Sequence, residues 1–412
     1  MQNAESNQGE ERSAPQSGIR NPQSEILSYP RIFIAAGEHS GDRFGASLAE
    51  ALRLLSPDVR LAGVGGPRMA GAGVRLVADT VAHSGMGLLS TFGNARRWIR
   101  VFRNCIREFN REPPDIFVPV DNPGFNLRLA GHARARRIPV CYYVSPQVWA
   151  WMPRRIHRVA RLVTRMMTIL PFEKALYDPL GVDCRYVGHP VLDYMAAAVM
   201  EPDSREKQLD SLGARGKTIL GLLPGSRSQE IRHTFPIICD AAAILRRRIP
   251  DAFFLVAAAS EEHVPELQSI LAARLGGAVL RIGHTPQIMQ LSKLCLAVSG
   301  TATLETAYFR TPMVVVYRTN RWARHIAPRL LRVPHFCLVN ILAGREIVPE
   351  FLKFDDDPRL IADAALKLLE DSGAWDRCRK DLDEVIRSLG PAGASERAAR
   401  AVLDCLETSR RR

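Results

Sequence analysis

Two short turns in the second half of the chain contain residue types suited to binding a diphosphate. The first turn holds Gly225, Ser226 and Arg227 and follows an apolar run at 218–223. A buried strand that leads through such a turn into a helix presents free N–H groups and the positive end of the helix dipole to an anion. Arg227 adds a guanidinium whose donors match phosphate oxygens. An ordinary turn with a surface arginine has the same spacing, so the first turn alone leaves both interpretations open.

The second turn has the same form and favours phosphate binding. It contains Ser299, Gly300 and Thr301 after the apolar run 294–298, and Glu305 lies near the start of the helical pattern that follows. The Glu305 carboxylate can accept hydrogen bonds from a ribose diol, although a carboxylate near a helix start also stabilises the dipole without any ligand. Because parallel strands end at a common sheet edge, the two turns can meet at one nucleoside diphosphate.

Polar side chains also follow two apolar runs in the first half of the chain. The earliest run leads into a turn that contains His39, Ser40 and Asp42, and the run 116–120 ends at Asp121. A carboxylate at the carboxyl end of a buried strand is well placed for acid–base chemistry. An Asx turn or a helix cap is the alternative interpretation of Asp121.

The elements that must position these residues alternate between strands and helices. Apolar runs predict strands in the first half at 31–36, 59–62, 116–120, 140–144 and 166–170, and in the second half at 218–223, 252–257, 279–282, 294–298 and 313–317. Helical patterns separate them, as in doubly wound parallel sheets. We therefore predict an α/β fold with two Rossmann-like domains that face a central cleft.

Composition divides the chain further. Residues 1–30 are polar and predict a disordered leader, with an N-terminal domain at 31–199, a C-terminal domain at 200–385 and a helix within 386–412 that packs on the N-terminal domain or on a partner subunit. The eight cysteines form no CxxC pair, which is typical of buried cytosolic thiols rather than of disulfides or zinc. The chain contains no run of about 18 apolar residues, so we expect no membrane span.

The positive charge is concentrated in the first half. The chain carries a net charge of +13, and residues 31–195 contain 23 Lys or Arg against 13 Asp or Glu. Trp98 and Phe102 recur at helical spacing among six arginines at 96–111, after an apolar stretch that includes Met86, Leu88 and Leu89. This pattern predicts a membrane-facing basic amphipathic helix. The alternative is a helix that faces the core and exposes its arginines.

Ten ordered motifs between residues 36 and 346 resemble those of lipid-A-disaccharide synthases, a family of glycosyltransferases with the glycosyltransferase-B architecture. The motifs are AGEHSGD (36–42), GVGGPRM (63–69), MGLLS (86–90), DNPGFN (121–126), YYVSPQVWAW (142–151), LPFEKALY (170–177), GHPVLD (188–193), LLPGSR (222–227), SGTATLE (299–305) and NILAGRE (340–346). Any one of them is weak, but ten in order are a specific signal. The leader lies outside the resemblance.

The resemblance implies a reaction. The donor is UDP-2,3-diacylglucosamine and the acceptor is 2,3-diacylglucosamine 1-phosphate (lipid X), and the products are a β-1,6-linked disaccharide and UDP. The donor is α-linked, so the reaction inverts the anomeric centre and needs a base for the acceptor hydroxyl. The resemblance implies Asp121 as a catalytic residue, Arg227 on the diphosphate, and Glu305 and Asn340 in the nucleotide pocket, while His39 could orient or replace Asp121.

The resemblance and the charges also predict partners. We expect no cofactor and no metal, because Arg227 and two helix N-termini supply positive charge to the departing UDP and no DxD-like cluster accompanies them. We expect a cytoplasmic protein that binds peripherally to the anionic inner face of the cytoplasmic membrane and binds no nucleic acid; a homodimer is left open.

Two other functions fit parts of the sequence. A UDP-sugar 2-epimerase shares the architecture and the diphosphate turns, and it differs in needing no lipid acceptor for UDP release. A non-enzymatic basic protein that binds membranes or nucleic acid would explain the arginines. It would leave the polar clusters at 121–126 and 299–305 without a role, and nucleic-acid binding would weaken steeply with salt.

Overall fold

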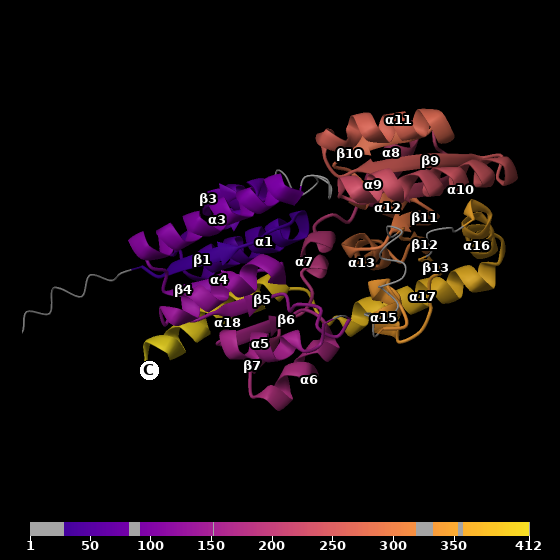
Figure 1. Ribbon diagram of the computed structural model, residues 1–412. Helices are drawn as coiled ribbons and strands as arrows, with labels where there is room; N and C mark the ends of the chain where they lie inside the picture. The colour runs from indigo at the N-terminus through magenta and orange to yellow at the C-terminus, as the bar shows by residue number, and fades with distance from the viewer. Residues whose placement is uncertain (1–28, 82–90, 151, 319–332, 353–356, 412) are drawn as a thin grey trace, which may run out of the picture.

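The computed structural model describes residues 29–81, 91–150, 152–318, 333–352 and 357–411. Two α/β units lie side by side, one drawn in indigo to magenta and the other mainly in rose to orange (Figure 1). In each unit, helices cover a parallel sheet.

The sheet of the first unit consists of seven parallel strands in two joined parts. Four strands have the order β3-β2-β1-β4 and three have the order β5-β6-β7. Isolated parallel bridges join Phe117 to Val140 and Val120 to Tyr143 between β4 and β5. The strands are β1 (Arg31–Ala35), β2 (Arg60–Gly65), β3 (Arg75–Asp79), β4 (Ile116–Pro119), β5 (Cys141–Tyr143), β6 (Arg165–Thr168) and β7 (Asp183–Tyr186).

The helices of the first unit lie on both faces of this sheet. They are α1 (His39–Leu55), α2 (Pro67–Gly71), α3 (Thr91–Arg111), α4 (Pro123–Ala135), α5 (Arg155–Leu162), α6 (Lys174–Tyr177) and α7 (Val191–Ala196), with short 3-10 turns η2 (Pro171–Glu173) and η3 (Asp178–Leu180). Along β1, Ile32 and Ile34 pack in one core cluster and Phe33 and Ala35 pack in the other. A strand that is buried on both faces explains the uninterrupted apolar run in the sequence.

The second unit is built on a six-stranded parallel sheet with the order β10-β9-β8-β11-β12-β13. Its strands are β8 (Thr218–Leu223), β9 (Ala252–Ala258), β10 (Val279–Ile282), β11 (Leu294–Val298), β12 (Met313–Val316) and β13 (Glu350–Phe351). Its helices are α8 (Pro202–Ser211), α9 (Ser228–His233), α10 (Phe235–Arg248), α11 (Val264–Arg274), α12 (Thr285–Leu291), α13 (Thr301–Tyr308), α15 (Leu338–Ala343), α16 (Pro358–Glu370) and α17 (Ser372–Ser388), with the 3-10 turn η4 (Glu261–His263).

Both sheets reverse their strand order at one point. In the first sheet the reversal lies between β1 and β4, and in the second it lies between β8 and β11. Ligands of open α/β sheets bind at the carboxyl ends of strands at such points. The turns that follow these four strands contain most of the candidate residues of the sequence, so the topology places both groups of candidates where a ligand is expected.

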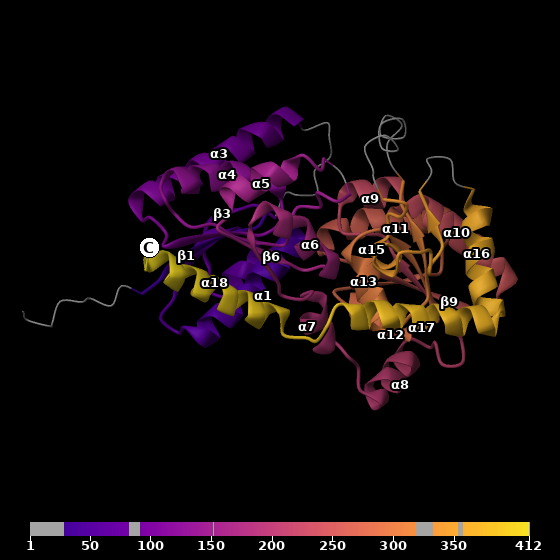
Figure 2. The same ribbon diagram turned by 90° about the horizontal axis from the view of Figure 1, so that it is seen from below.

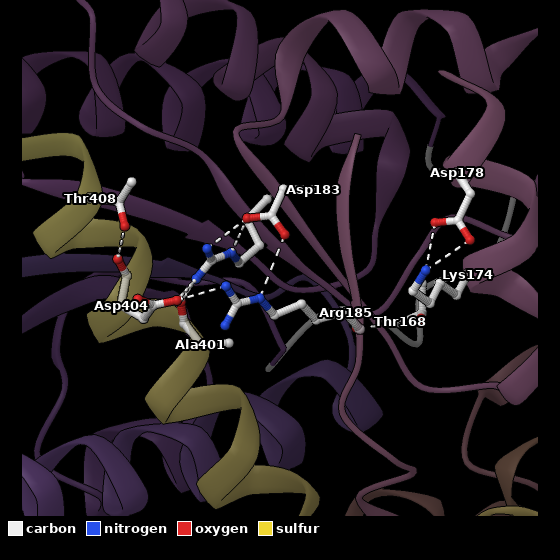
Figure 3. A network of polar contacts seen from close by, with 9 residues as sticks. Thr168, Lys174, Asp178, Asp183, Arg185, Ala401, Asp404 and Thr408 are labelled. Atoms are coloured by element: carbon white, nitrogen blue, oxygen red, sulfur yellow. Dashed lines mark hydrogen bonds and ion pairs between the residues drawn. The ribbon is translucent and has the colours of Figure 1, made fainter. Parts of the chain in front are cut away.

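The last helix, α18 (Ala394–Arg410), returns to the first unit and packs beside α1 (Figure 2). Arg165 of β6 is almost fully buried, and its guanidinium bonds to Asp404 of α18 at 2.8 Å and to Asp183 of β7 at 2.6 Å. Arg185 also contacts Asp404, at 2.8 Å (Figure 3). Two arginines and two carboxylates thus attach the end of the chain to the edge of the first sheet.

Helix α3 differs from the predicted membrane element. The indole of Trp98 packs on the ring of Phe125 in α4 with centroids 5.0 Å apart, and Phe102 approaches the same ring at 6.1 Å. Both aromatic side chains are half-buried against the core cluster, as in the predicted alternative of a helix that faces the core and exposes its arginines. The exposed face of α3 instead carries Ile99 and arginines, including Arg96, Arg100, Arg103 and Arg107. Met86, Leu88 and Leu89 lie outside the described residues.

Candidate active site

A cavity of about 1410 Å³ lies between the two units. This volume exceeds that of a typical small-ligand pocket, about 300–1,000 Å³. Most of the candidate residues line it, and they come from both units: His39, Ser40 and Asp121 from the first, and Gly225, Ser226, Arg227, Ser299, Gly300, Thr301 and Glu305 from the second. The structure therefore brings together ten residues that the sequence places in four separate turns.

Two predicted site residues do not line the cavity. Asp42 is buried, and its carboxylate accepts hydrogen bonds from the backbone N–H groups of Gly66, Arg68 and Met69 at 2.7, 3.2 and 3.1 Å. It therefore fixes the start of α2 against α1. The predicted substrate-binding role of Asp42 is corrected to a structural one, because its oxygens are already committed to the backbone.

Asn340 is the second correction. Its side chain is fully buried, its Oδ1 accepts from the N–H groups of Ile347 and Val348 at 2.8 and 3.1 Å, and its Nδ2 donates to the carbonyl of Val348 at 2.9 Å. These bonds close the loop after α15. Asn340 does not line the cavity, although Leu338 and Ile341 of the same helix do. Its predicted place in the nucleotide pocket is therefore corrected to a role in supporting the loop that follows α15.

The first of the two predicted diphosphate turns contains a carboxylate, Glu230, that the sequence prediction did not use. Glu230 accepts from the backbone N–H groups of Ser226 and Arg227 at 3.0 and 3.2 Å, and it also pairs with the Arg227 guanidinium at 3.0 Å. Gly225 has φ 92, and a Cβ there would lie 2.4 Å from the Glu230 carboxylate. Glu230 thus shapes the turn and accepts hydrogen bonds from two of the N–H groups that were predicted to bind the diphosphate. The Arg227 side chain is then the principal donor that this turn offers to a diphosphate.

The second turn keeps donors toward the cavity. Gly300 precedes α13, and Thr301 and Ala302, both on the cavity wall, are the first residues of that helix. N–H groups in the first turn of a helix have no partner within it and carry the positive end of the dipole. This wall can therefore receive an anion beside Arg227.

Two ion pairs cross the cavity between the units. Arg227 contacts Glu38, which precedes α1, and Arg43 of α1 pairs with Glu305 of α13 at 2.9 Å. Tyr194 donates its hydroxyl to the same Glu305 oxygen at 2.8 Å, and the Arg43 guanidinium lies over the Tyr194 ring at 4.5 Å. Arg227 and Glu305, two of the residues predicted to bind a nucleoside diphosphate, are therefore each paired with a side chain from the first unit.

Sequence reasoning did not assign Arg43 or Tyr194. Arg43 lies one helical turn after His39, and Tyr194 directly follows the motif GHPVLD. The position of Arg43 on the helix face shared with His39 was the available signal, because residues four apart lie on one side of a helix.

Asp121 sits at the end of β4 in a left-handed conformation with φ 48. Its N–H donates to the Tyr143 carbonyl at 3.0 Å, and its own carbonyl accepts from the Tyr142 hydroxyl at 2.7 Å and from Asn126 Nδ2 at 2.8 Å. These bonds hold the backbone and leave the carboxylate on the cavity wall. Such strain in a non-glycine residue is characteristic of functional sites.

Loss of hydration raises the pKa of Asp121 to about 6, and the charge of Glu38 adds to the rise, while Arg227 opposes it. His39 is exposed at the start of α1, and loss of hydration lowers its pKa, with a further lowering contribution from His263. Both groups can therefore be unprotonated near pH 7, as a general base must be.

Among the described residues, no cluster of three or more His, Cys, Asp or Glu side chains is arranged to hold a metal ion.

Comparison with known proteins decides the family. The model of the lipid-A-disaccharide synthetase family matches residues 32–404. The chain belongs to this family. The lipid-A-disaccharide synthase of Geobacter sulfurreducens is 37% identical over 378 residues, which cover 91% of this chain and 97% of the relative. That of Anaeromyxobacter dehalogenans is 39% identical over 375 residues, with coverage of 90% and 97%. That of Myxococcus xanthus is 36% identical over 382 residues, with coverage of 92% and 99%.

Solved structures confirm the predicted glycosyltransferase-B fold. The Staphylococcus aureus MnaA–UDP co-structure has a TM-score of 0.63 at 13% identity, covering 89% of this chain and 94% of that chain. The Neisseria meningitidis UDP-GlcNAc 2-epimerase bound to UDP-GlcNAc has a TM-score of 0.53 at 12% identity, covering 92% and 100%. The glycosyltransferase of kitacinnamycin has a TM-score of 0.56 at 14% identity, covering 92% and 99%. At such identities the likeness concerns the fold alone, and membership of the synthase family identifies the chain as a glycosyltransferase rather than an epimerase.

Proposed function

We propose that this glycosyltransferase moves 2,3-diacylglucosamine from UDP-2,3-diacylglucosamine to the 6-hydroxyl of 2,3-diacylglucosamine 1-phosphate. The products are the β-1,6 disaccharide 1-phosphate and UDP. The observation that carries the proposal is the cleft itself, in which Arg227 and Glu305 of the second unit face Asp121 of the first. The residues proposed to bind the nucleotide and a carboxylate with a raised pKa line one cavity in a member of the synthase family.

The second unit supplies the proposed nucleotide wall. Arg227 and the first turn of α13 hold the diphosphate, with Gly225, Ser226, Ser299 and Gly300 shaping the two turns around it. Glu305 accepts from the ribose hydroxyls through Oε2, because Arg43 and Tyr194 both bond to its Oε1. Ser40 faces the nucleotide from the opposite wall.

The first unit supplies the proposed base. The acceptor 6-hydroxyl attacks C1 of the donor sugar as the bond from C1 to the diphosphate oxygen breaks, and Asp121 takes the hydroxyl proton in that step. The diphosphate leaves with increased negative charge, which Arg227 and the α13 N-terminus stabilise. His39, on the neighbouring turn, orients the acceptor or takes over the proton. Positive charge is thus provided without a metal ion, and we propose metal-independent turnover.

We also propose how the chain meets its surroundings. Residues 31–199 act as the acceptor and membrane-facing domain and residues 200–385 as the UDP-sugar domain, with residues 386–412 bracing the first. The exposed arginines of α3 attract the anionic inner face of the cytoplasmic membrane, so the protein works as a peripheral cytoplasmic enzyme. No helix of the described residues is long and apolar enough to cross a bilayer.

Mass spectrometry of the products tests the reaction. Purified protein is incubated with UDP-2,3-diacylglucosamine and lipid X, and the expected product has the mass of both sugars joined with the loss of UDP. The same mixture without lipid X is the control, and it releases no UDP. Release of UDP, or conversion of the donor sugar to its C2 epimer, in the absence of lipid X would contradict the proposal and favour an epimerase.

A further inference from the structure

Trp149 lies on the cavity wall of the first unit, in the loop that follows β5. Its indole shares this wall with Asp121 and Gln147. The indole N–H donates to Oε1 of Glu173 at 3.1 Å, and the ring of Phe172 meets the indole edge to face, with centroids 5.2 Å apart and planes at 85°. One half-buried aromatic ring is therefore held in place by a hydrogen bond and by an aromatic contact while it borders the cavity.

Glu173 is an unusual residue to find behind this ring. It is only 1% exposed, and its other oxygen accepts from the N–H of Leu170 at 3.1 Å. Loss of hydration raises the pKa of Glu173 to about 7. A buried carboxyl group is unfavourable unless its oxygens are satisfied, and here one oxygen caps the turn and the other holds the indole. Capping the turn needs only one acceptor, so the second bond is the feature to be explained.

The backbone in front of Trp149 is also constrained. Val144, directly after β5, has φ 66, a left-handed conformation that is costly for a β-branched residue. Farther along the loop, the Ser145 hydroxyl bonds to the Tyr177 hydroxyl at 2.8 Å, which fastens the loop to α6. The loop thus keeps an unfavourable conformation that aims it along the cavity wall, at the same sheet edge as the left-handed Asp121.

We propose that the Trp149 indole is the platform on which the pyranose ring of the acceptor stacks, with Glu173 as the positioning residue that fixes the indole. Aromatic rings bind the C–H face of a sugar by dispersion and burial of apolar area. The assignment to the acceptor rests on position: Trp149 lies on the same wall as Asp121, whereas the proposed diphosphate and ribose ligands, Arg227 and Glu305, lie on the other. The proposal rests on the function proposed above, since it deepens the acceptor half of that site.

Steady-state kinetics separate this role from a structural one. Trp149→Ala is expected to raise KM for lipid X about 10-fold, the upper range for one aromatic contact, and to leave KM for the UDP donor within about 2-fold. Glu173→Ala, which releases the indole, is expected to raise the acceptor KM by a smaller factor in the same direction. Glu173→Gln keeps only one acceptor oxygen for the two N–H groups, of Trp149 and Leu170, that Glu173 now serves. Its acceptor KM is therefore expected to lie between those of the wild type and of Glu173→Ala.

Trp375→Phe is the matched control, because this tryptophan also donates its N–H to an oxygen, the Lys293 carbonyl at 3.4 Å, but lies on α17. It should leave both KM values unchanged. An unchanged acceptor KM in Trp149→Ala, or an equal rise in both KM values, would overturn the platform. Trp149→Phe, which retains a ring, provides the comparison should the alanine variant fail to fold, and it is expected to raise only the acceptor KM.

Binding of the head group alone keeps this test independent of turnover. Glucosamine 1-phosphate, which has no acyl chains, is added to the protein with UDP, and saturation-transfer NMR is expected to show contact with the sugar protons for the wild type and loss of it for Trp149→Ala. Sugar signals in a wild type that forms no disaccharide would refute the proposed reaction but not the platform. Absence of sugar signals beside a raised acceptor KM would show that the indole contacts an acyl chain and would refute the platform.

Discussion

Replacing Asp121 by asparagine tests the proposed base directly. The substitution preserves the size of the side chain and removes its ability to accept a proton at neutral pH. A carboxylate base in hydrogen-bond reach typically contributes roughly 10²–10⁴-fold to the rate, so kcat of Asp121→Asn should fall by a factor in that range. Affinity for UDP should stay nearly unchanged, because the proposed nucleotide residues lie on the other unit.

The raised pKa of Asp121 determines how the rate should depend on pH. With a pKa of about 6 for Asp121, the carboxylate fraction is about one half at pH 6 and about one tenth at pH 5. The wild-type kcat/KM should fall in the same proportion on its acidic side. Glu38→Gln removes a negative charge that raises the pKa of Asp121, so the acidic limb should move to lower pH in that variant.

The assay measures initial rates of disaccharide formation in detergent micelles between pH 5 and 8, with UDP affinity determined separately by calorimetry. His39→Ala is the comparison variant and should cost much less than Asp121→Asn. Normal turnover of Asp121→Asn together with an inactive His39→Ala would make histidine the base. Near-normal rates in both variants would remove the base assignment from both residues. An acidic limb that stays in place in Glu38→Gln would refute the electrostatic reasoning about Asp121.

The remaining predictions concern charge. Arg227→Ala should lower kcat roughly 10²–10³-fold with the circular dichroism spectrum unchanged, because the departing diphosphate loses a charged donor. EDTA should leave turnover of the wild type unchanged in the product assay. Charge reversal of Arg96, Arg100 and Arg103 to Glu should reduce co-sedimentation with anionic vesicles. Burial lowers the pKa of His189 to about 3. Between this value and the ordinary pKa of 6.5, His189 binds a proton in the unfolded chain but not in the folded chain. The free energy of unfolding should therefore fall by about 2 kcal/mol from pH 6.5 to pH 5. In urea titrations, His189→Gln should remove this contribution to the pH dependence of the free energy of unfolding.

Each of these has a contrary outcome. Activity of Arg227→Ala within a few-fold of the wild type would make Arg227 an ordinary surface residue. Loss of turnover in EDTA that Mg²⁺ restores would refute the metal-free mechanism. Equal sedimentation of the wild type and the triple variant would remove α3 from membrane binding. An unchanged pH slope in His189→Gln would show that other groups cause the acid sensitivity.

The sequence predicts the sheets well because their signals are local. The runs at 218–223 and 294–298 coincide with β8 and β11, since a strand buried on both faces must be apolar throughout. The run at 279–282 coincides with the edge strand β10, in which Arg281 and Ile282 are exposed. Strands β3 and β7 were missed. They contain charged residues and lie at the two edges of the first sheet, where burial is incomplete and no continuous apolar run is required.

The candidate site was predicted less completely, for a different physical reason. A polar side chain at a sheet edge can turn toward a ligand or toward unsatisfied backbone groups, and the choice depends on segments far away in the sequence. The Asp42 carboxylate accepts hydrogen bonds from the N–H groups of Gly66 and Met69, and the Asn340 side chain donates to the Val348 carbonyl. The same limit applies to Trp98, whose inward side became evident only once Phe125 lay beside it.

The charges across the cleft connect nucleotide binding with the strength of the base. Arg227 is paired with Glu38, and both charges act on Asp121, Glu38 raising its pKa and Arg227 lowering it. Under the proposed assignment, a diphosphate on Arg227 displaces Glu38 and neutralises the guanidinium. The positive charge of Arg227 then no longer lowers the pKa of Asp121, while the negative charge of Glu38 still raises it. The affinity of Asp121 for a proton therefore rises when the donor is bound. A carboxylate that becomes more basic in the donor complex is better matched to the poorly acidic hydroxyl that it must deprotonate.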